Sequence, residues 1–469
     1  MTNNQNTARL TPPRIIALLT TLTAIVLVLM PAPDGVEPIA LKGLGVGLFA
    51  VGLFATVAVS EHLSAMLFMA VAMIIGIAPA EVVFSGFHST AFWLMFGGII
   101  IGVAVQQTGL GRVVVASVLD RFLGGYVSIV IGIVLVCILL AFLMPSTMGR
   151  IILLVPLILA LADHMGYAPD SNERKGIVLA AVCGAWMPAA AILPANVPNI
   201  ILAGVSERSF DVVFTYGSYL ITQFPVNGAV KAITLVGIIL LLFPSSGKTV
   251  QTTESQEAPH PLRADGKLLA TVLVVTIGLW ATDFLHHISP AWIGLAAAIV
   301  CMMPGTGLLS PDDFKTKFNF PSTIYLAGVL GLGAVLVETG AGDIIGDWLL
   351  AHVPLSRDAP FTSFASMIGL GMAVSAAATV PSVPVIVGPM ADQISAMTGF
   401  PIETVLMSQV IAYTSIFLPY QVPPLVVGFY LGGITLRDGA KVTLALAAAA
   451  ILLIIPLNYL WWSWLGLLG

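Results

Sequence analysis

Residues 143–150 read LMPSTMGR and interrupt an apolar run that extends from about residue 125 to residue 168. Pro145 removes a backbone donor and disfavours helix at the residue before it, while Gly149 permits an unusual turn. The sequence therefore predicts that a helix breaks here. Only 9% of the residues in the chain are charged, so a break that also gathers two hydroxyl groups and Arg150 requires a physical explanation.

The composition of the chain indicates an integral membrane protein. Of its 469 residues, 58% are hydrophobic, a share that does not fit the largely polar surface of a soluble domain. The net charge of −5 and the lack of a lysine or arginine cluster argue against nucleic acid as a partner. The three cysteines lie far apart in apolar segments, so we predict no disulfide framework, no transition-metal site and no cofactor.

Repeated apolar runs of roughly 18 to 25 residues, each able to cross a ~30 Å hydrocarbon core, predict an all-α polytopic protein with about eleven spans. The predicted spans are 14–32, 38–59, 63–80, 90–108, 175–205, 218–243, 267–285, 289–304, 322–339, 403–433 and 438–466. Two further apolar regions, 125–168 and 361–398, are broken in the middle by proline and small polar residues. Each is either two full spans or a re-entrant hairpin that returns to the same side.

The distribution of basic residues orients this map, because lysine and arginine concentrate in cytoplasmic loops. With the N-terminus inside, the outside segments hold Lys42, Arg208 and Arg357. The cytoplasmic segments hold Arg9, Arg14, Arg112, Arg121, Arg174, Lys175, Lys248, Arg263, Lys267, Lys315, Lys317, Arg437 and Lys441. We therefore predict a cytoplasmic N-terminus and an outside C-terminus, in the inner (plasma) membrane of a bacterium.

The two halves of the chain resemble each other. STAFWLMFGG at 89–98 recurs as STIYLAGVLG at 322–331, and QTGLG at 107–111 recurs as ETGAG at 338–342. The same order and a nearly constant offset favour a duplication, and an odd number of crossings between equivalent positions makes the repeats inverted. The predicted division is an N-terminal segment with the first helix (1–37), repeat 1 (38–243), a cytoplasmic linker (244–266) and repeat 2 (267–469). Repeat 1 contains the hairpin 125–168 and the broken helix 175–205, and repeat 2 contains the hairpin 361–398 and the broken helix 403–433.

The hairpin tips are candidate anion sites. A helix break at membrane depth frees backbone N–H and C=O groups, which is tolerated only inside protein or beside a watery cavity. The freed amides at the start of the next half-helix carry partial positive charge, and Ser146 and Thr147 add hydroxyl donors. The counterpart in the second half is ATVPSVPVI at 378–386, where Thr379 and Ser382 flank Pro381.

A second pair of breaks lies in LPANVPNII at 193–201 and LPYQVPPLV at 418–426. Asn196, Asn199 and Gln421 add side-chain donors for a substrate, and unwound carbonyls around Ala195 and Tyr420 are candidate ligands for a hard cation such as sodium. The candidate cation ligands are Ser146, Thr147, Ala195, Thr379 and Tyr420. A single break fits a proline kink equally well, whereas two pairs of breaks favour a transport site near the midplane.

Other ionisable and small residues in the spans have simpler interpretations. Arg150 either neutralises the substrate or reaches a water-filled cytoplasmic vestibule and holds the hairpin tip, and we favour the second. Lys231 is predicted to be interfacial or paired between helices, as is Glu338, which is also a candidate proton-coupling site. The paired glycines Gly97 and Gly98 predict a close helix contact.

On these residues the chain resembles the divalent-anion/sodium symporter (DASS) family, within the ion transporter superfamily of citrate transporter-like and sodium:sulfate symporter-like permeases. The resemblance implies eleven spans, two re-entrant hairpins, a homodimer and elevator movement, with dicarboxylate, citrate or sulfate carried together with sodium. Ser146 matches the family's Ser-Asn-Thr tip, and Pro198 and Asn199 match its Gly-Thr-Pro-Pro-Asn turn. Thr147 stands where the family has asparagine.

The sequence therefore predicts a secondary active transporter of a small, divalent anion, coupled to sodium as symport, and not an enzyme. The substrate is expected to contact Ser146, Thr147, Asn196, Asn199, Thr379, Ser382 and Gln421. Three alternatives remain open: coupling to H⁺, a sodium-independent exchanger of the same fold, and an arsenite-type export permease that works with a partner ATPase.

Overall fold

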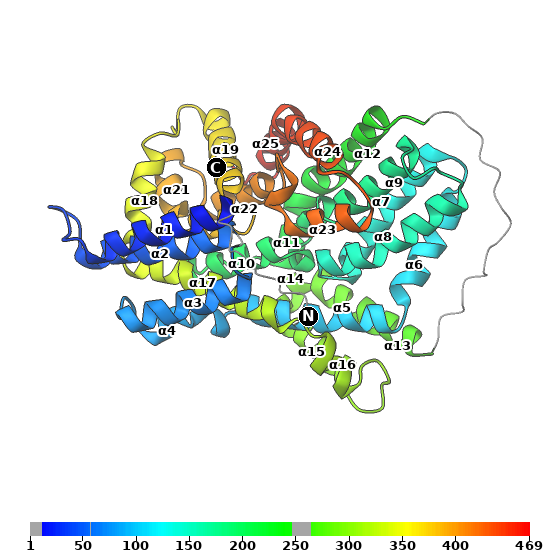
Figure 1. Ribbon diagram of the computed structural model, residues 1–469, viewed down its shortest axis with the longest axis horizontal. Helices are drawn as coiled ribbons and strands as arrows, with labels where there is room; N and C mark the ends of the chain where they lie inside the picture. Colours follow the sequence, from blue (N-terminus) through cyan, green and yellow to red (C-terminus); the bar gives the residue numbers. More distant parts are fainter. Residues whose placement is uncertain (1–11, 57, 246–263) are drawn as a thin grey trace, which may run out of the picture.

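The computed structural model describes residues 12–56, 58–245 and 264–469, and all regular structure in these residues is helical (Figure 1). The predicted all-α architecture is confirmed. Arg9 and most of the predicted linker lie outside the described residues. The helices of the first half are α1 (Pro12–Leu29), α2 (Pro38–Thr56), α3 (Glu61–Ile75), α4 (Ala80–Val83), α5 (Thr90–Gln107), α6 (Leu110–Leu119), α7 (Tyr126–Leu143), α8 (Thr147–His164), α9 (Asn172–Gly184), α10 (Val197–Phe210), α11 (Tyr216–Gln223) and α12 (Lys231–Leu242).

The second half continues with thirteen further helices among the described residues. They are α13 (Ala264–Ala281), α14 (Asp283–His286), α15 (Pro290–Met302), α16 (Pro311–Lys317), α17 (Phe320–Glu338), α18 (Ala341–Leu350), α19 (Pro360–Ala377), α20 (Ser382–Ile386), α21 (Ala391–Thr398), α22 (Ile402–Tyr413), α23 (Pro423–Leu431), α24 (Leu436–Ala449) and α25 (Ile455–Trp464). Two features recur at matching places. Gly109 and Gly340 adopt left-handed conformations before α6 and α18, and π-helical turns occupy Phe224–Val230 and Ala450–Ile454.

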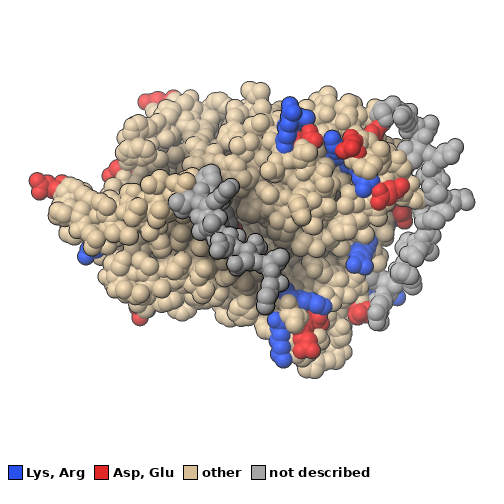
Figure 2. Space-filling model, in the orientation of Figure 1, with Lys and Arg blue, Asp and Glu red and all other residues tan. Residues whose placement is uncertain are grey.

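The length and apolarity of the helices identify an integral membrane protein. Within the described residues, eight helices are long and apolar enough to cross a membrane, or nine if the bent pair 388–398 and 402–413 forms one span. Three shorter apolar helices lie at 14–29, 61–75 and 290–302. Figure 2 shows a face whose left part carries charged side chains only at its edge, as expected where lipid surrounds the protein, whereas charged side chains gather on the right part.

The two broken regions form different hairpins. Region 125–168 folds into α7 and α8, which have 18 residues each and the composition of full spans, joined at Met144–Ser146. Region 361–398 consists of the 18-residue α19 in its first arm and the short pieces α20, 388–390 and α21 in its second arm. The second hairpin returns in pieces because Pro381 precedes α20 and Pro389 lies in the turn 388–390, where each removes a backbone donor.

The hairpins and the broken helices pack in a crossed arrangement at the centre of the molecule (Figure 1). Helix α9 packs against the first hairpin, and α22 packs against the second. The half-helix that follows each break packs against the other half of the chain. Helix α10 of the first half packs against α20 and α22, and α23 of the second half packs against α8 and α9. Glycines permit these contacts: a Cβ on Gly428 would lie 2.6 Å from Val182 Cγ1, and one on Gly388 would lie 2.8 Å from Val205 Cγ1.

The predicted close contact at Gly97 and Gly98 is confirmed. A Cβ on Gly97 would lie 2.8 Å from the backbone carbonyl carbon and oxygen of Gly294 in α15. A Cβ on Gly98 would lie 2.8 Å from Cγ of Pro145, at the tip of the first hairpin. The two glycines therefore bring α5 against α15 and leave room for the tip. Glu338 is exposed at the end of α17.

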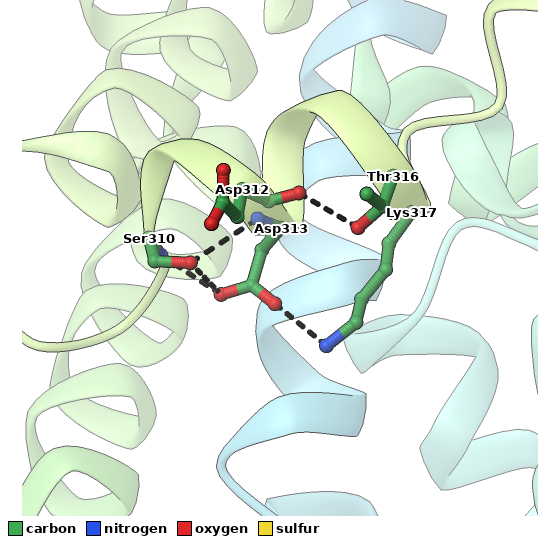
Figure 3. Close-up of polar contacts among 5 residues, drawn as sticks. All are labelled: Ser310, Asp312, Asp313, Thr316 and Lys317. Atoms are coloured by element: carbon green, nitrogen blue, oxygen red, sulfur yellow. Dashed lines mark hydrogen bonds and ion pairs between the residues drawn. The ribbon is translucent and has the colours of Figure 1, made fainter.

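Helix α16 is a short surface helix whose start is held by a capping box (Figure 3). Ser310 Oγ accepts a hydrogen bond from Asp313 N at 3.1 Å, and Asp313 Oδ2 accepts one from Ser310 N at 2.9 Å. Asp313 Oδ1 also pairs with Lys317 Nζ at 2.6 Å. The Lys317 ammonium and the donors of Ser310 hold the pKa of the Asp313 carboxyl well below its usual range.

We expect Asp313→Asn to accelerate amide hydrogen exchange in α16 and to leave the melting temperature of the protein unchanged, because this cap is local and exposed. The lowered pKa means that the stabilisation is complete above the ordinary aspartate pKa of about 3.9 and is lost only as pH falls through the lower folded value. The exchange difference between the two proteins should therefore be constant from about pH 5 to pH 8. Asp312→Asn is the control, since Asp312 Oδ1 lies 4.0 Å from Lys315 Nζ and outside the capping box. An equal effect of both substitutions would contradict the prediction.

Candidate functional site

The tip of the first hairpin is a capped helix start. Ser146 has extended backbone angles and its Oγ accepts a hydrogen bond from Gly149 N at 3.1 Å. Ser146 N in turn donates to Met144 O at 2.8 Å across Pro145. The predicted break therefore lies at this position, and the hydroxyl hydrogen of Ser146 and the first amides of α8 remain available to an acceptor.

Arg150 binds this tip to the first broken helix and is fully buried. Its Nε and Nη2 donate to Ala185 O at 3.1 and 2.9 Å, and Nη2 also donates to Ala195 O at 3.0 Å and to Thr147 Oγ1 at 3.1 Å. Nη1 donates to Met144 O. All of these acceptors are neutral oxygens. Of the two roles considered from the sequence, Arg150 therefore holds the tip, but from inside the protein and without contact to a water-filled vestibule.

Asn196 and Asn199 lie at the break of the first broken helix and have different hydrogen-bonding roles. Asn196 Oδ1 caps α10 by accepting from Asn199 N at 3.2 Å. The Nδ2 group of Asn196 is buried and lacks a partner among the described residues. Asn199 Nδ2 donates to Ala190 O at 3.0 Å and to Ile192 O at 2.9 Å, so both of its amide hydrogens are used. Of these two asparagines in the described part of the chain, Asn196 alone keeps a free buried donor.

Two tyrosines that the sequence analysis did not select join this break to the rest of the site. Tyr413 OH, from the end of α22, donates to Asn199 Oδ1 at 2.6 Å and so connects the two broken helices. Tyr219 OH donates to Ala190 O at 2.9 Å. The only indication in the sequence was that a tyrosine inside an apolar segment needs a hydrogen-bond partner when it is buried.

The tip of the second hairpin is held by backbone and neutral side chains. Val380 N donates to Gln421 O at 3.1 Å, which joins the tip to the second broken helix. Thr379 and Ser382 are buried, and within the described residues their hydroxyl groups make no hydrogen bond. Ser382 lines a small, partly open hollow whose other walls include Phe54. With five residues, α20 offers little of the helix dipole that α8 provides.

Gln421 organises the second broken helix. Its Oε1 accepts hydrogen bonds from Phe417 N and Leu418 N, both at 2.8 Å, and its Nε2 donates to Ser375 Oγ at 2.8 Å. Gln421 is fully buried, so one amide hydrogen remains for another acceptor. Tyr420 is half-exposed, and its hydroxyl donates to Ala376 O in the second hairpin.

Lys231 is a second fully buried cation, and it lies against the end of α22. Its Nζ donates to Thr414 Oγ1 at 2.7 Å, to Asn227 Oδ1 at 2.8 Å and to Ser415 Oγ at 3.4 Å. These contacts agree with an inter-helix role but involve neutral oxygens. The C-terminal ends of α9 and α22 carry partial negative charge, and each lies beside a buried cation: Arg150 at α9 and Lys231 at α22.

The structure brings the predicted residues together in three groups. Thr147 and Ala195 meet at the Arg150 guanidinium, and Ser146 caps α8 beside them; this is the first junction of tip and broken helix. Thr379, Tyr420 and Gln421 lie at the corresponding second junction. The bond between Asn199 and Tyr413 links the two broken helices. Among the described residues, no hydrogen bond joins one hairpin tip directly to the other.

Comparison with known proteins places this fold in a family. The family model for the sodium:sulfate symporter transmembrane region matches residues 13–468. A membrane protein of Cupriavidus necator is 24% identical over 94% of this chain and 91% of its own length. The L-tartrate/succinate antiporter of Escherichia coli is 23% identical over 55% of this chain and 54% of its own length.

A solved structure agrees with this assignment at the level of the fold. The YdaH transporter of Alcanivorax borkumensis superposes with a TM-score of 0.59 and 14% sequence identity, over 97% of this chain and 98% of the transporter. The family match extends over nearly the whole chain, and it confirms the resemblance found from the helix breaks. The chain belongs to the sodium:sulfate symporter family of membrane transporters, whose members carry anions and are not enzymes.

Proposed function

We propose that this protein is a secondary active transporter of a small divalent anion, of the dicarboxylate, citrate or sulfate class. The observation that carries the proposal is the unpartnered Nδ2 group of Asn196, buried beside the first junction. A buried donor without a partner costs stability unless a ligand uses it. Family membership and the L-tartrate/succinate antiporter among the relatives support an anion of this chemistry.

The proposed binding groups are donors, which suits a negative substrate. Thr147 Oγ1 accepts from Arg150, so its own hydroxyl hydrogen is free to point away from the guanidinium. Ser146, the first amides of the 18-residue α8 and the Asn196 amide complete the set in the first half. Thr379, Ser382 and the remaining amide hydrogen of Gln421 serve the second half. Bonds from such donors to a carboxylate or sulfate are charge-assisted and strong.

Asn199 enters this proposal as a supporting residue. Both of its amide hydrogens bond to backbone carbonyls and its oxygen accepts from Tyr413, so it orients the break and leaves contact with the anion to Asn196.

We further propose sodium as the coupling ion, with elevator movement of the hairpins and broken helices. Thr379 and the carbonyl of Tyr420 are the proposed cation ligands of the second half. The proposal includes a homodimer and a bacterial inner membrane, with the N-terminus in the cytoplasm and the C-terminus outside. A sodium-independent exchanger is the second candidate, and the antiporter among the relatives favours it.

The test is uptake of labelled succinate, citrate and sulfate into proteoliposomes, with and without an inward sodium gradient. Sodium-driven accumulation of one anion would establish symport and its substrate class. Counterflow that is unaffected by sodium would establish exchange. Absence of flux for all three anions would contradict the proposed substrate class and direct the search to arsenite and a partner ATPase.

Asn196→Ser tests the binding group that carries the proposal. Serine keeps an oxygen that can cap α10 but removes the free amide donor. We expect an unchanged melting temperature and uptake of the transported anion that is weaker by about 10-fold or more, as a lost hydrogen bond to a charged group implies. The control is Ser171→Asn, which exchanges one good cap for another at α9, far from the breaks. Full uptake by Asn196→Ser would show that this amide does not contact the substrate.

A further inference from the structure

The first junction contains a charge that the second junction lacks. Thr147 and Ala195, two of the oxygens that the sequence predicts as cation ligands, both accept hydrogen bonds from Arg150. The other two acceptors, Met144 O and Ala185 O, are carbonyls of the tip and of the end of α9. Hydroxyl and carbonyl oxygens are the hard ligands that a sodium ion would use, and here all four face one guanidinium.

The guanidinium also links the hairpin tip to the broken helix, as a bound cation would. It connects the hairpin tip at Met144 and Thr147 to the broken helix at Ala185 and Ala195, and it is fully buried between them. Because arginine remains protonated in proteins, this link does not depend on the ion composition of the medium. The four oxygens therefore already surround a positive charge when no ion is bound.

The second junction is held differently. Gln421 bonds to Ser375 Oγ and to Val380 N, and Tyr420 bonds to Ala376 O, all through neutral groups. Lys231 bonds to Thr414 and Ser415 at the end of α22 and to Asn227, and within the described residues it makes no hydrogen bond to the second tip. The two halves therefore differ in whether a charged side chain closes the contact between tip and broken helix.

We propose that the guanidinium of Arg150 is a resident cation that takes the place of a coupling cation at the first junction. The first hairpin then closes onto its broken helix without sodium, and any dependence on sodium arises at the second junction alone. The part of this inference that concerns coupling rests on the proposed transport function. The part that concerns cation binding stands on the geometry of the first junction.

The test removes the side chain and supplies a cation in solution. Arg150→Ala leaves four oxygens around an empty volume, so we expect a lower melting temperature that rises with the logarithm of added guanidinium or sodium at millimolar concentration. Choline, which is too large for the volume, should have no effect. The wild-type protein should show no guanidinium-dependent rise. If guanidinium and sodium stabilise Arg150→Ala no more than the wild type, the junction is not a cation site and the proposal fails.

Lys231→Ala is the matched control, because Lys231 is the other fully buried cation with neutral partners. Its three oxygens surround one ammonium nitrogen, so planar guanidinium should not rescue this variant. Equal rescue of Lys231→Ala would mean that guanidinium acts on the protein in general, and this outcome would overturn the assignment.

The wild-type protein provides a measurement that does not depend on folding of a variant. Amide hydrogen exchange at 147–151 should be unaffected by sodium, whatever the response at 379–383. Slower exchange at 147–151 in sodium would overturn the proposal. These binding results can be told apart from the transport results. If added cations stabilise Arg150→Ala but the protein carries no anion, the resident-cation proposal stands and the proposed transport function fails. If the protein carries an anion but added cations do not stabilise Arg150→Ala, the transport function stands and the resident-cation proposal fails.

Discussion

Replacing Asn199 with alanine is expected to destabilise the protein by about 3–5 kcal/mol, because buried partners lose their hydrogen bonds together. Ile192 O would be left unsatisfied in the interior, and Tyr413 OH would lose its bond to Asn199 Oδ1. Ala190 O would keep its bond from Tyr219, so it contributes less to the loss. We expect a clearly lower melting temperature in detergent and loss of anion uptake, since the same side chain joins the two broken helices.

Two controls separate this network from a general intolerance of substitution. Tyr413→Phe removes the bond to Asn199 Oδ1 but leaves Asn199 Nδ2 bonded to two carbonyls, so its cost should be smaller, at about 1–3 kcal/mol. Asn172→Ala changes an exposed asparagine at the start of α9 and should lie within about 0.5 kcal/mol of the wild type. If Asn199→Ala melts like Asn172→Ala, the network does not support the break.

Replacing Gly97 with alanine is the second substitution with a large expected effect. The new methyl group would lie 2.8 Å from the carbonyl carbon and oxygen of Gly294 and 3.0 Å from Leu295 N, all backbone atoms that cannot rotate away. Helices α5 and α15 would have to separate, at a cost of about 1–3 kcal/mol or more. The measurement is the melting temperature of the purified protein together with its yield in the membrane.

The same interface and the same helix supply controls for this prediction. A Cβ on Gly294 would meet Trp280 Cζ2 at 3.5 Å and Leu94 Cδ1 at 3.7 Å, which are ordinary contacts, so Gly294→Ala should be tolerated. A Cβ on Gly102 would meet nothing within 4 Å, and Gly102→Ala in the same α5 should be neutral or stabilising by up to about 1 kcal/mol. Equal loss in all three variants would show that helix contacts here depend on small residues in general and not on the one backbone approach.

The positions of the helix breaks could be predicted from local sequence. Pro145 and the capping oxygen of Ser146 act on their immediate neighbours, so the break before α8 lies where the sequence indicated. The same holds for Asn196 and Pro198 at the start of α10. The hydrogen bonds of Asn199 could not be predicted, because its partner Tyr413 lies 214 residues away in the chain.

Hydrophobic length and proline geometry are local properties, so a helical membrane protein with breaks at four places can be predicted from the sequence alone. Which polar groups remain free at those breaks depends on the tertiary structure. Arg150 and Asn199 read as available side chains in the sequence, but their hydrogen bonds are taken up by carbonyls and a tyrosine from other segments. Asn196 remains with a free donor because none of its neighbours in space offers an oxygen to Nδ2. Satisfaction of buried polar groups depends on packing between distant segments, so it follows from the fold and not from the spacing of residues.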